Sequence, residues 1–351
     1  MPLRGSDPQS RRGPAAEPER SLIERAADAL LVGLADGRSR DVETLLATTV
    51  ASGVPPEAPL RELERRGLAL IQNDDGTIRL ARPLDLLDAD SLLGRIPENV
   101  ARRIERLELF VSLDSTNRRL LDGEPPRPGA ARVCIAEYQH AGRGRRGRRW
   151  IVPPAAGLCL SAAWSFAVRP EALSALALAA GVAARRAIRD ACGLDVTLKW
   201  PNDLVLDGGK LGGILVETAP RPRGGVLAVV GVGINVALPR DAAALIDWPG
   251  GATDLATPLR GVPPSRTALA AALIARLVDV LGSYAETGLE PYLAELRAAD
   301  ALEGLRVVVA DAERETTGVA AGIDVDGALL VADERGRCRR ILAGDVTVRP
   351  T

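Results

Sequence analysis

The two lysines of this sequence are the residues best suited to fixing positive charge at one point. Lys199 and Lys210 are the only lysines among 45 basic residues, and every other basic residue is arginine. A lysine ammonium is a compact point charge, which the planar guanidinium of arginine does not replace. Chance survival is the alternative explanation. Because both lysines lie within a few residues of each other, in LKWPND and GGKLGG, we predict that they are functionally required.

A second candidate is the run EYQHAGRGRRGRRW at 137–150, which packs five arginines and three glycines between Gly142 and Arg149. Its glycines match G-x-G-x-x-G, but they lead into Trp150, prolines and a strand rather than a helix, which excludes a dinucleotide fingerprint. No lysine followed by Ser or Thr ends the run, so it is not a Walker A loop. An RNA-binding RG segment is also disfavoured, because such repeats usually lie in disordered tails, whereas this run lies between two predicted strands. We predict a loop that wraps an anionic ligand and is ordered when that ligand binds.

Composition bounds the class of protein. The chain has 351 residues, 46% of them hydrophobic, and a formal net charge of −1, so we expect several cores and no global attraction to nucleic acid or membrane. It has no uncharged apolar run long enough to span a bilayer, which predicts a cytoplasmic protein. Widely separated cysteines without a C-x-x-C pair predict buried free thiols rather than a zinc site. These cysteines are Cys134, Cys159, Cys192 and Cys338.

The first part of the chain predicts a disordered tail at 1–20 and a winged helix-turn-helix at 21–82. A capping box of Ser21 and Glu24 opens the first helix, and Asp41 caps the second. A third helix runs from a pair of prolines to Gly67, and a hairpin turns at Asp75-Gly76.

This module lacks the charges that DNA binding requires. The third helix starts with Pro55, Pro56, Glu57, Ala58 and Pro59, where a recognition helix presents basic or amide side chains. Carboxylates at this helix and at the hairpin tip repel phosphate. We therefore expect a vestigial or protein-contacting module rather than an operator-binding one.

The rest of the chain predicts an α+β catalytic domain at 83–302 and a small barrel at 303–351. A helical connector at 83–105 leads into strand patterns joined mostly by hairpins, which favours a mixed or largely antiparallel sheet with helices on one side. Helices are predicted at 115–123, 170–193 and 265–288. Short alternating strands after 303 are typical of an SH3-like barrel.

Five motifs in order identify a resemblance. DSTN at 114–117, the arginine run, KWPND at 199–203, KLGGILVE at 210–217 and GVGIN at 231–235 resemble the signatures of biotin protein ligases, specifically the bifunctional bacterial form. That resemblance implies a winged helix, a class II synthetase-like catalytic domain and an SH3-like barrel, in that order. It implies that biotin and ATP, with Mg²⁺, form biotinyl-5'-AMP and pyrophosphate. Biotin then passes to a lysine of a biotin carboxyl carrier domain, and a homodimer through the catalytic sheet is implied as well.

The resemblance also implies roles for individual residues. Those implied to bind biotin are Ser115, Thr116, Asn117, Gln139, Arg143, Gly144, Arg145 and Lys210. Those implied to bind ATP are Arg145, Trp150, Lys199, Asn202 and Asn235. Those implied to be catalytic are Lys210, Arg145 and Asp203, and no metal ligand is assigned.

Alternatives stay open at several of these positions. Ser115 and Thr116 also suit a helix N-cap, and Asp203 also suits a structural hydrogen bond rather than metal contact or proton acceptance. Core packing is the alternative for Trp150 and Asn202. The arginines Arg146, Arg148 and Arg149 are expected to be solvated.

Two other functions compete with the ligase. The first is a biotin-responsive transcriptional repressor, in addition or instead, which a gel shift with the adenylate present would detect. The second is a lipoate ligase, which shares the catalytic fold; the arginine run and KWPND favour biotin. The chain is not itself a carrier, because Met1 is its only methionine and the Met-Lys-Met acceptor sequence is absent.

Overall fold

The computed structural model describes residues 21–47, 54–221, 224–310, 315–342 and 347–350. The chain divides into two compact units, Met1–Pro83 and Leu84–Thr351. The segment predicted as a disordered tail, 1–20, lies outside the described residues.

The first unit contains three helices and a two-stranded hairpin, as the sequence predicts. Ser21 and Glu24 form the predicted capping box, and Gly76 turns the hairpin with a φ of +84°. Apolar residues three and four apart bury one face of the first helix, with Leu30, Leu31 and Leu34 fully buried. The elements are α1 (Leu22–Leu34), α2 (Val42–Ala47), α3 (Glu57–Arg65), β1 (Leu70–Gln72) and β2 (Ile78–Leu80).

The basic residues at the end of α3 are paired within this unit. The buried Arg66 side chain donates to Asp28 at 2.6 Å and to Glu62 at 2.9 Å, and Arg65 pairs with Glu62 at 2.7 Å. Burial raises the pKa of Glu62, but the bonds from Arg65 and Arg66 outweigh it, so that pKa is lowered overall. These two guanidinium groups therefore serve the packing of α3.

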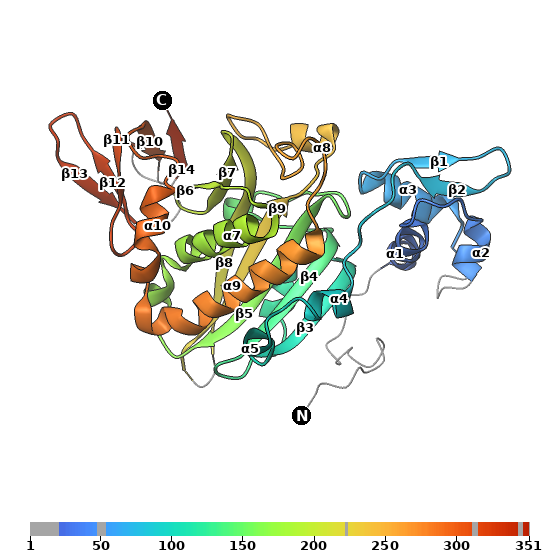
Figure 1. The fold of residues 1–351 in the computed structure, drawn as a ribbon, viewed down its shortest axis with the longest axis horizontal. Helices are drawn as coiled ribbons and strands as arrows, with labels where there is room; N and C mark the ends of the chain where they lie inside the picture. The colour runs from blue at the N-terminus through green and yellow to red at the C-terminus, as the bar shows by residue number, and fades with distance from the viewer. Residues whose placement is uncertain (1–20, 48–53, 222–223, 311–314, 343–346, 351) are drawn as a thin grey trace. The chain divides into compact units, whose positions relative to one another are not determined.

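The second unit is built on a seven-stranded mixed sheet. Its order is β3-β4-β5-β9-β8-β7-β6, in which only β3 and β4 run parallel (Figure 1). Hairpin connections produce the antiparallel pairs β6–β7, β7–β8 and β8–β9, as the sequence predicts. The strands are β3 (Ile104–Leu113), β4 (Ala131–Gln139), β5 (Gly157–Phe166), β6 (Thr197–Lys199), β7 (Asp203–Leu206), β8 (Gly209–Pro220) and β9 (Val226–Asn235).

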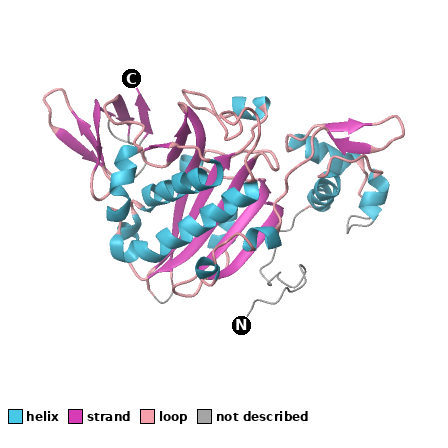
Figure 2. Ribbon diagram, in the orientation of Figure 1, coloured by secondary structure: helices cyan, strands magenta, loops and turns pink. Residues whose placement is uncertain are grey.

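Helices cover both faces of this sheet, so the prediction of helices on one side is wrong. The long helices α7 (Leu176–Cys192) and α9 (Arg266–Thr287) pack on one face (Figure 2). The short helix α6 (Thr116–Leu121) packs on the other. Strand alternation produces the two faces: Val133 and Ile135 join the first core, whereas Cys134 and Ala136 join the second.

Among the described residues one helix, α9, has the length and apolar composition to cross a membrane. Its apolar residues instead lie in the core of the second unit, where Leu269, Ile274 and Leu277 are fully buried against the sheet and α7. Packing against the sheet accounts for its apolar character.

Short helical segments account for most differences from the predicted elements. The predicted helix at 170–193 is broken into a 3₁₀ turn, η2 (Pro170–Leu173), and α7. The connector contains two short helices, and β3 already begins at Ile104. Helices of one or two turns carry too few residues for a periodic pattern. The two helices of the connector are α4 (Ala89–Leu93) and α5 (Glu98–Ala101). The short helices that the sequence does not predict are α8 (Arg240–Ala244), η3 (Glu290–Tyr292) and α10 (Leu293–Ala298).

The chain ends in a five-stranded antiparallel sheet of order β13-β12-β11-β10-β14. A turn of this domain contacts the KWPND segment: the buried Trp200 indole donates to the Gly327 carbonyl at 2.9 Å. A Cβ placed at Gly327 would lie 2.6 Å from Ala175 Cβ. The strands are β10 (Arg306–Ala310), β11 (Glu315–Ile323), β12 (Leu329–Ala332), β13 (Cys338–Ile341) and β14 (Thr347–Pro350).

We predict that Gly327→Ala weakens the attachment of this domain. Gly327 has a φ of +87° and close neighbours, so an alanine there adds backbone strain and a steric clash, about 2–4 kcal/mol in free energy of unfolding. Gly336→Ala is the matched control, because its φ is +74° and its Cβ would meet nothing within 4 Å, leaving about 1–2 kcal/mol of strain alone. Urea unfolding followed by Trp fluorescence measures both. Equal losses in the two variants would contradict the close packing.

Candidate active site

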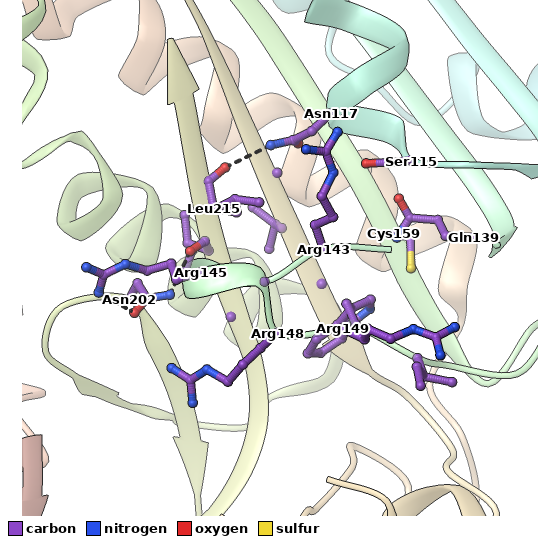
Figure 3. Close-up of a pocket in the computed structure, with 18 of the residues that line it drawn as sticks. Ser115, Asn117, Gln139, Arg143, Arg145, Arg148, Arg149, Cys159, Asn202 and Leu215 are labelled. Atoms are coloured by element: carbon purple, nitrogen blue, oxygen red, sulfur yellow. Dashed lines mark hydrogen bonds between the residues drawn. The ribbon is translucent and has the colours of Figure 1, made fainter. Parts of the chain in front are cut away.

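A pocket of about 350 Å³ lies on the α6 face of the sheet, at the ends of β4, β5, β8 and β9 (Figure 3). Its volume is in the range of small-molecule sites. It brings together most of the residues that the resemblance implicates. The predicted residues that line it are Ser115, Thr116, Asn117, Gln139, Arg143, Gly144, Arg145, Trp150, Asn202, Asp203 and Lys210.

Alternate glycines of the GVGIN motif make room in this pocket. Residues two apart on a strand face the same side, so Gly231 and Gly233 of β9 both face α6 and the arginine run. A Cβ at Gly231 would lie 2.2 Å from Asn117 Oδ1, and one at Gly233 would lie 2.5 Å from the Trp150 ring. Any larger residue would therefore displace a wall of the pocket.

Neutral hydrogen-bonding groups form one wall. The buried Ser161 hydroxyl contacts Thr116 Oγ1 at 2.7 Å and Asn117 Oδ1 at 2.6 Å. The Thr116 backbone N–H donates to Gln139 Oε1 at 2.8 Å. Ser115 caps α6 by accepting from the Arg118 N–H, so the predicted N-cap role is confirmed, while its side chain also lines the pocket. Such a wall can match both donors and acceptors of a polar ring.

The arginine run forms a closed loop over the pocket. The Trp150 N–H donates to the Gly142 carbonyl, the Gly144 N–H donates to the Arg148 carbonyl, and a 3₁₀ turn, η1 (Arg145–Gly147), forms its tip. Arg146 in this turn has a φ of +58°, a left-handed conformation that is strained for a residue with a side chain. The backbone hydrogen bonds close the loop on itself, and its ordering by a bound anion stays a prediction.

Two arginines of this loop reach strands β7 and β8. Arg145 Nη1 donates to Asn202 Oδ1 at 3.2 Å, and Asn202 in turn donates to the Ile214 carbonyl. Arg143 extends toward Asn117 (Figure 3) and ion-pairs with Glu217 at 3.8 Å. Arg148 and Arg149 are exposed as predicted but also line the pocket edge.

Lys210 is held beside a carboxylate on the opposite wall. Its Nζ lies 2.6 Å from Asp203 Oδ1, and both side chains are largely buried. Its backbone bonds to the 251–253 segment, where the Lys210 N–H donates to the Gly251 carbonyl. The Asn235 amide donates to the Lys210 and Thr253 carbonyls at 3.2 and 3.0 Å. The Lys210 ammonium is therefore fixed in position.

The structure does not bring Lys199 and Asn235 into the pocket lining. The buried Lys199 ammonium lies 4.1 Å from the centre of the Trp248 ring, and the Lys210 ammonium lies 5.0 Å from it. Both contacts are within cation–π range. Asn235 is fully buried and supports the Lys210 backbone instead. The two lysines thus share one aromatic neighbour.

Sequence reasoning missed three residues that do not line the pocket but contact residues that do. Ser161 shares a strand face with Cys159, so strand alternation could have found it. Glu217 ends the KLGGILVE motif and received no role. Trp248 stands in a loop rich in proline and glycine, where a large aromatic residue signals a packing or binding contact.

The residue types that commonly bind metal ions do not cluster in the described parts of the chain. Within the described parts of the chain, no group of three or more His, Cys, Asp or Glu could hold a metal ion. The cysteines are free, and Cys134 and Cys159 are buried as predicted. Cys192 is only half-buried and Cys338 is exposed, so the prediction of buried thiols is wrong for these two. Cys338 is exposed because it lies on the edge strand β13, in which no residue is buried.

We predict that the pocket thiol Cys159 resists alkylation. Burial raises its pKa to about 11, although contacts with Trp150 and Gln139 lower it, so the thiol is neutral at pH 8 and ionises only as the pH approaches 11. Iodoacetamide at pH 8 should modify Cys338 and leave Cys159 intact, as measured by peptide mass spectrometry. Unfolded protein, in which both react, is the control. Equal labelling in the native protein would contradict the buried location.

Comparisons with known proteins agree with this geometry. Residues 109–235 match the biotin/lipoate A/B protein ligase family, and residues 304–349 match the biotin protein ligase C-terminal domain. The chain is 32% identical over 324 residues to the bifunctional ligase/repressor BirA of Escherichia coli, covering 91% of this chain and 96% of that one. It is 35% identical to the biotin–[acetyl-CoA-carboxylase] ligase of Paracoccus denitrificans, covering 65% of this chain and 95% of that one.

A solved structure shows the same fold. The Aquifex aeolicus biotin protein ligase in complex with biotin and ATP is 25% identical to this chain, with a TM-score of 0.57, and covers 71% of this chain and 100% of that one. The match to a full-length relative, the two domain matches and the shared fold agree. This chain belongs to the biotin protein ligase family.

Proposed function

We propose that this pocket joins biotin to AMP, with release of pyrophosphate, and passes biotin to a lysine of a biotin carboxyl carrier domain. The observation that carries the proposal is that one pocket is lined by Lys210 and the loop arginines Arg143 and Arg145 together with neutral hydrogen-bonding groups. The neutral wall suits a ureido ring, and the cations suit a carboxylate meeting a triphosphate. Names of relatives that include biotin–[acetyl-CoA-carboxylase] ligase support the same reaction and carrier.

The cationic side chains of the pocket reduce the electrostatic repulsion between the two substrates of this reaction. A carboxylate and a polyphosphate repel each other, and cations fixed where charge builds up lower that barrier. Two unit charges 4 Å apart interact by about 4 kcal/mol at an effective dielectric constant near 20. Lys210 is placed by Asp203 and by its backbone bonds, so little reorganisation is needed when the substrates arrive. Magnesium would accompany ATP and take most of its ligands from phosphate and water.

Transfer of biotin requires a neutral acceptor amine. A lysine with a pKa near 10.4 is neutral about once in 2,500 molecules at pH 7. Asp203 is our candidate acceptor for the proton, and its contact with Lys210 supports a second task, that of orienting the ammonium. The remaining assignments follow the resemblance: Ser115, Thr116, Asn117 and Gln139 on the biotin side, and Lys199, Asn202, Asn235 and Trp150 on the ATP side.

Trp150 departs from the role that the resemblance implies, because it lies beside Gln139 and Cys159. We therefore move it from the ATP side to the end of the pocket that we assign to the biotin ring. Lys199 and Asn235 lie behind the pocket, so we assign them supporting tasks through Trp248 and through the Lys210 backbone. A lipoate ligase is the competing assignment. The match of residues 304–349 to a biotin protein ligase domain favours biotin.

We infer that the domains are a winged helix at 21–82, a class II synthetase-like catalytic domain at 83–302 and an SH3-like barrel at 303–351. The pairing of Arg65 and Arg66 with Glu62 and Asp28 supports a protein-contacting or vestigial winged helix rather than an operator-binding one. We further propose a cytoplasmic homodimer associated through the catalytic sheet.

We predict that Lys210→Ala lowers the rate of adenylate formation about 100- to 1,000-fold, because a fixed cation at the developing charge is lost. Biotin-dependent ATP–pyrophosphate exchange measures this step. Lys199→Ala, whose side chain does not line the pocket, should show a smaller loss. Unaltered exchange in the Lys210 variant would refute its role. Faster exchange with lipoate than with biotin would refute the choice of substrate.

Arg145→Gly should let the intermediate escape. The change removes the bond to Asn202 that attaches the loop to the strands, so the loop opens more often while Lys210 still promotes the chemistry. Radiolabelled adenylate should appear in the filtrate of a spin column, whereas the unmodified protein retains it. Arg169→Gly, an exposed arginine outside the pocket lining, is the control. Equal retention by both variants would contradict a role in closure.

A further inference from the structure

We propose that Glu217 is a positioning residue that links recognition of the substrate ring to the placement of the arginine loop. The proposal rests on the proposed function, since it concerns how the same pocket binds biotin. Glu217 lies on β8, and its carboxylate bridges two elements that carry the ligand contacts. One oxygen accepts from Asn117 on α6 at 2.8 Å, and the other pairs with Arg143 on the loop at 3.8 Å.

The first contact fixes which end of the Asn117 amide faces the pocket. An ionised carboxylate only accepts hydrogen bonds, so it must face the NH₂ end of the amide. The Leu215 carbonyl accepts from the same Nδ2 at 3.2 Å. Both amide protons are therefore directed toward β8, and the carbonyl Oδ1 is directed toward Ser161.

This orientation leaves Asn117 as an acceptor toward the ligand. Oδ1 carries no proton, so the Ser161 hydroxyl, 2.6 Å away, is the donor of that bond. A carbonyl oxygen accepts two hydrogen bonds, and the second position is available to an N–H of a ureido ring. If the amide were reversed, an NH₂ group would face that ring N–H, and the pair would repel. Glu217 therefore sets the polarity of the ring contact.

The second contact attracts the loop to the same residue. Arg143 follows Gly142 at the start of the closed loop, and its guanidinium extends toward Asn117 (Figure 3). The Glu217 side chain is 26% exposed and that of Arg143 is 44% exposed, so the ion pair is a weak one that a ligand anion can outcompete. This ion pair holds the loop near the substrate ring, and the Arg143 guanidinium can still exchange Glu217 for a ligand anion.

The contacts of Glu217 with Asn117 and with Arg143 differ in strength, so different substitutions at Glu217 can test them separately. Loss of a buried amide partner costs more than loss of a half-exposed ion pair. Glu217→Gln keeps an acceptor for Asn117 but removes the charge that attracts Arg143. Glu217→Ala removes both. Neither change touches Lys210, so the rate at saturating substrate should be preserved.

The test is steady-state ATP–pyrophosphate exchange with the full-length chain. We expect Glu217→Ala to raise the KM for biotin about tenfold and Glu217→Gln about threefold, with kcat and the KM for ATP within about twofold of the unmodified chain. In an Arg143→Met background, Glu217→Gln should add no further increase, because the ion pair is already lost. A higher KM for biotin with an unchanged kcat indicates a positioning role, because a general loss of folded protein would lower kcat as well.

Glu124→Gln is the matched control. Glu124 pairs with Arg132 at 3.6 Å, a similar separation, and Arg132 does not line the pocket, whereas Asn117 and Arg143, the partners of Glu217, do. The KM values of Glu124→Gln should therefore not change. An unchanged KM for biotin in both Glu217 variants would overturn the inference, as would additive effects of Glu217→Gln and Arg143→Met. If the unmodified chain itself shows no biotin-dependent exchange, the proposed function fails instead, and the two failures are distinguishable.

Discussion

Positive charge held in place in a largely buried setting is the constraint on which this pocket depends. A cation removed from water loses solvation free energy unless a partner compensates for it. Asp203 compensates Lys210 at 2.6 Å, and the Trp248 ring lies beside both lysines. Glu217 and Asn202 serve the loop arginines in the same way. Each cation is thus paired to a group on β7, β8 or a neighbouring loop, and the sheet fixes the geometry of the charge.

Glycines in the sheet also leave room for the pocket. Gly231 and Gly233 lie on the face opposite the two long helices, and their missing Cβ atoms leave room for Asn117 and Trp150. The other face of the same strand carries Val230, Val232 and Ile234 into the core. One strand therefore supports the fold through its branched residues and the site through its glycines, as period-two alternation allows.

Much of the architecture could be predicted because local signals were strong. The capping box at Ser21, the turn at Gly76 and the long apolar strands all appear where the patterns place them. The broken helix at Pro170 and the short helices α4, α5 and α8 could not be predicted, because one or two turns carry no clear period. Most of the expected pocket residues do line it, but Lys199 and Asn235 lie behind it. Both residues belong to quoted motifs, and membership of a motif did not reveal which direction their side chains would take.

The motifs and the composition are properties of the chain alone, so they suffice to indicate the family, the order of the main helices and strands, and the concentration of cationic side chains at two lysines and one loop. The partners that hold those cations follow from the folded arrangement. Glu217 meets Asn117 across 100 positions of sequence, and Arg145 meets Asn202 across 57. Such pairs arise when strands from distant segments are brought into one sheet, and side-chain polarity within them depends on the acceptors that the fold places opposite each amide.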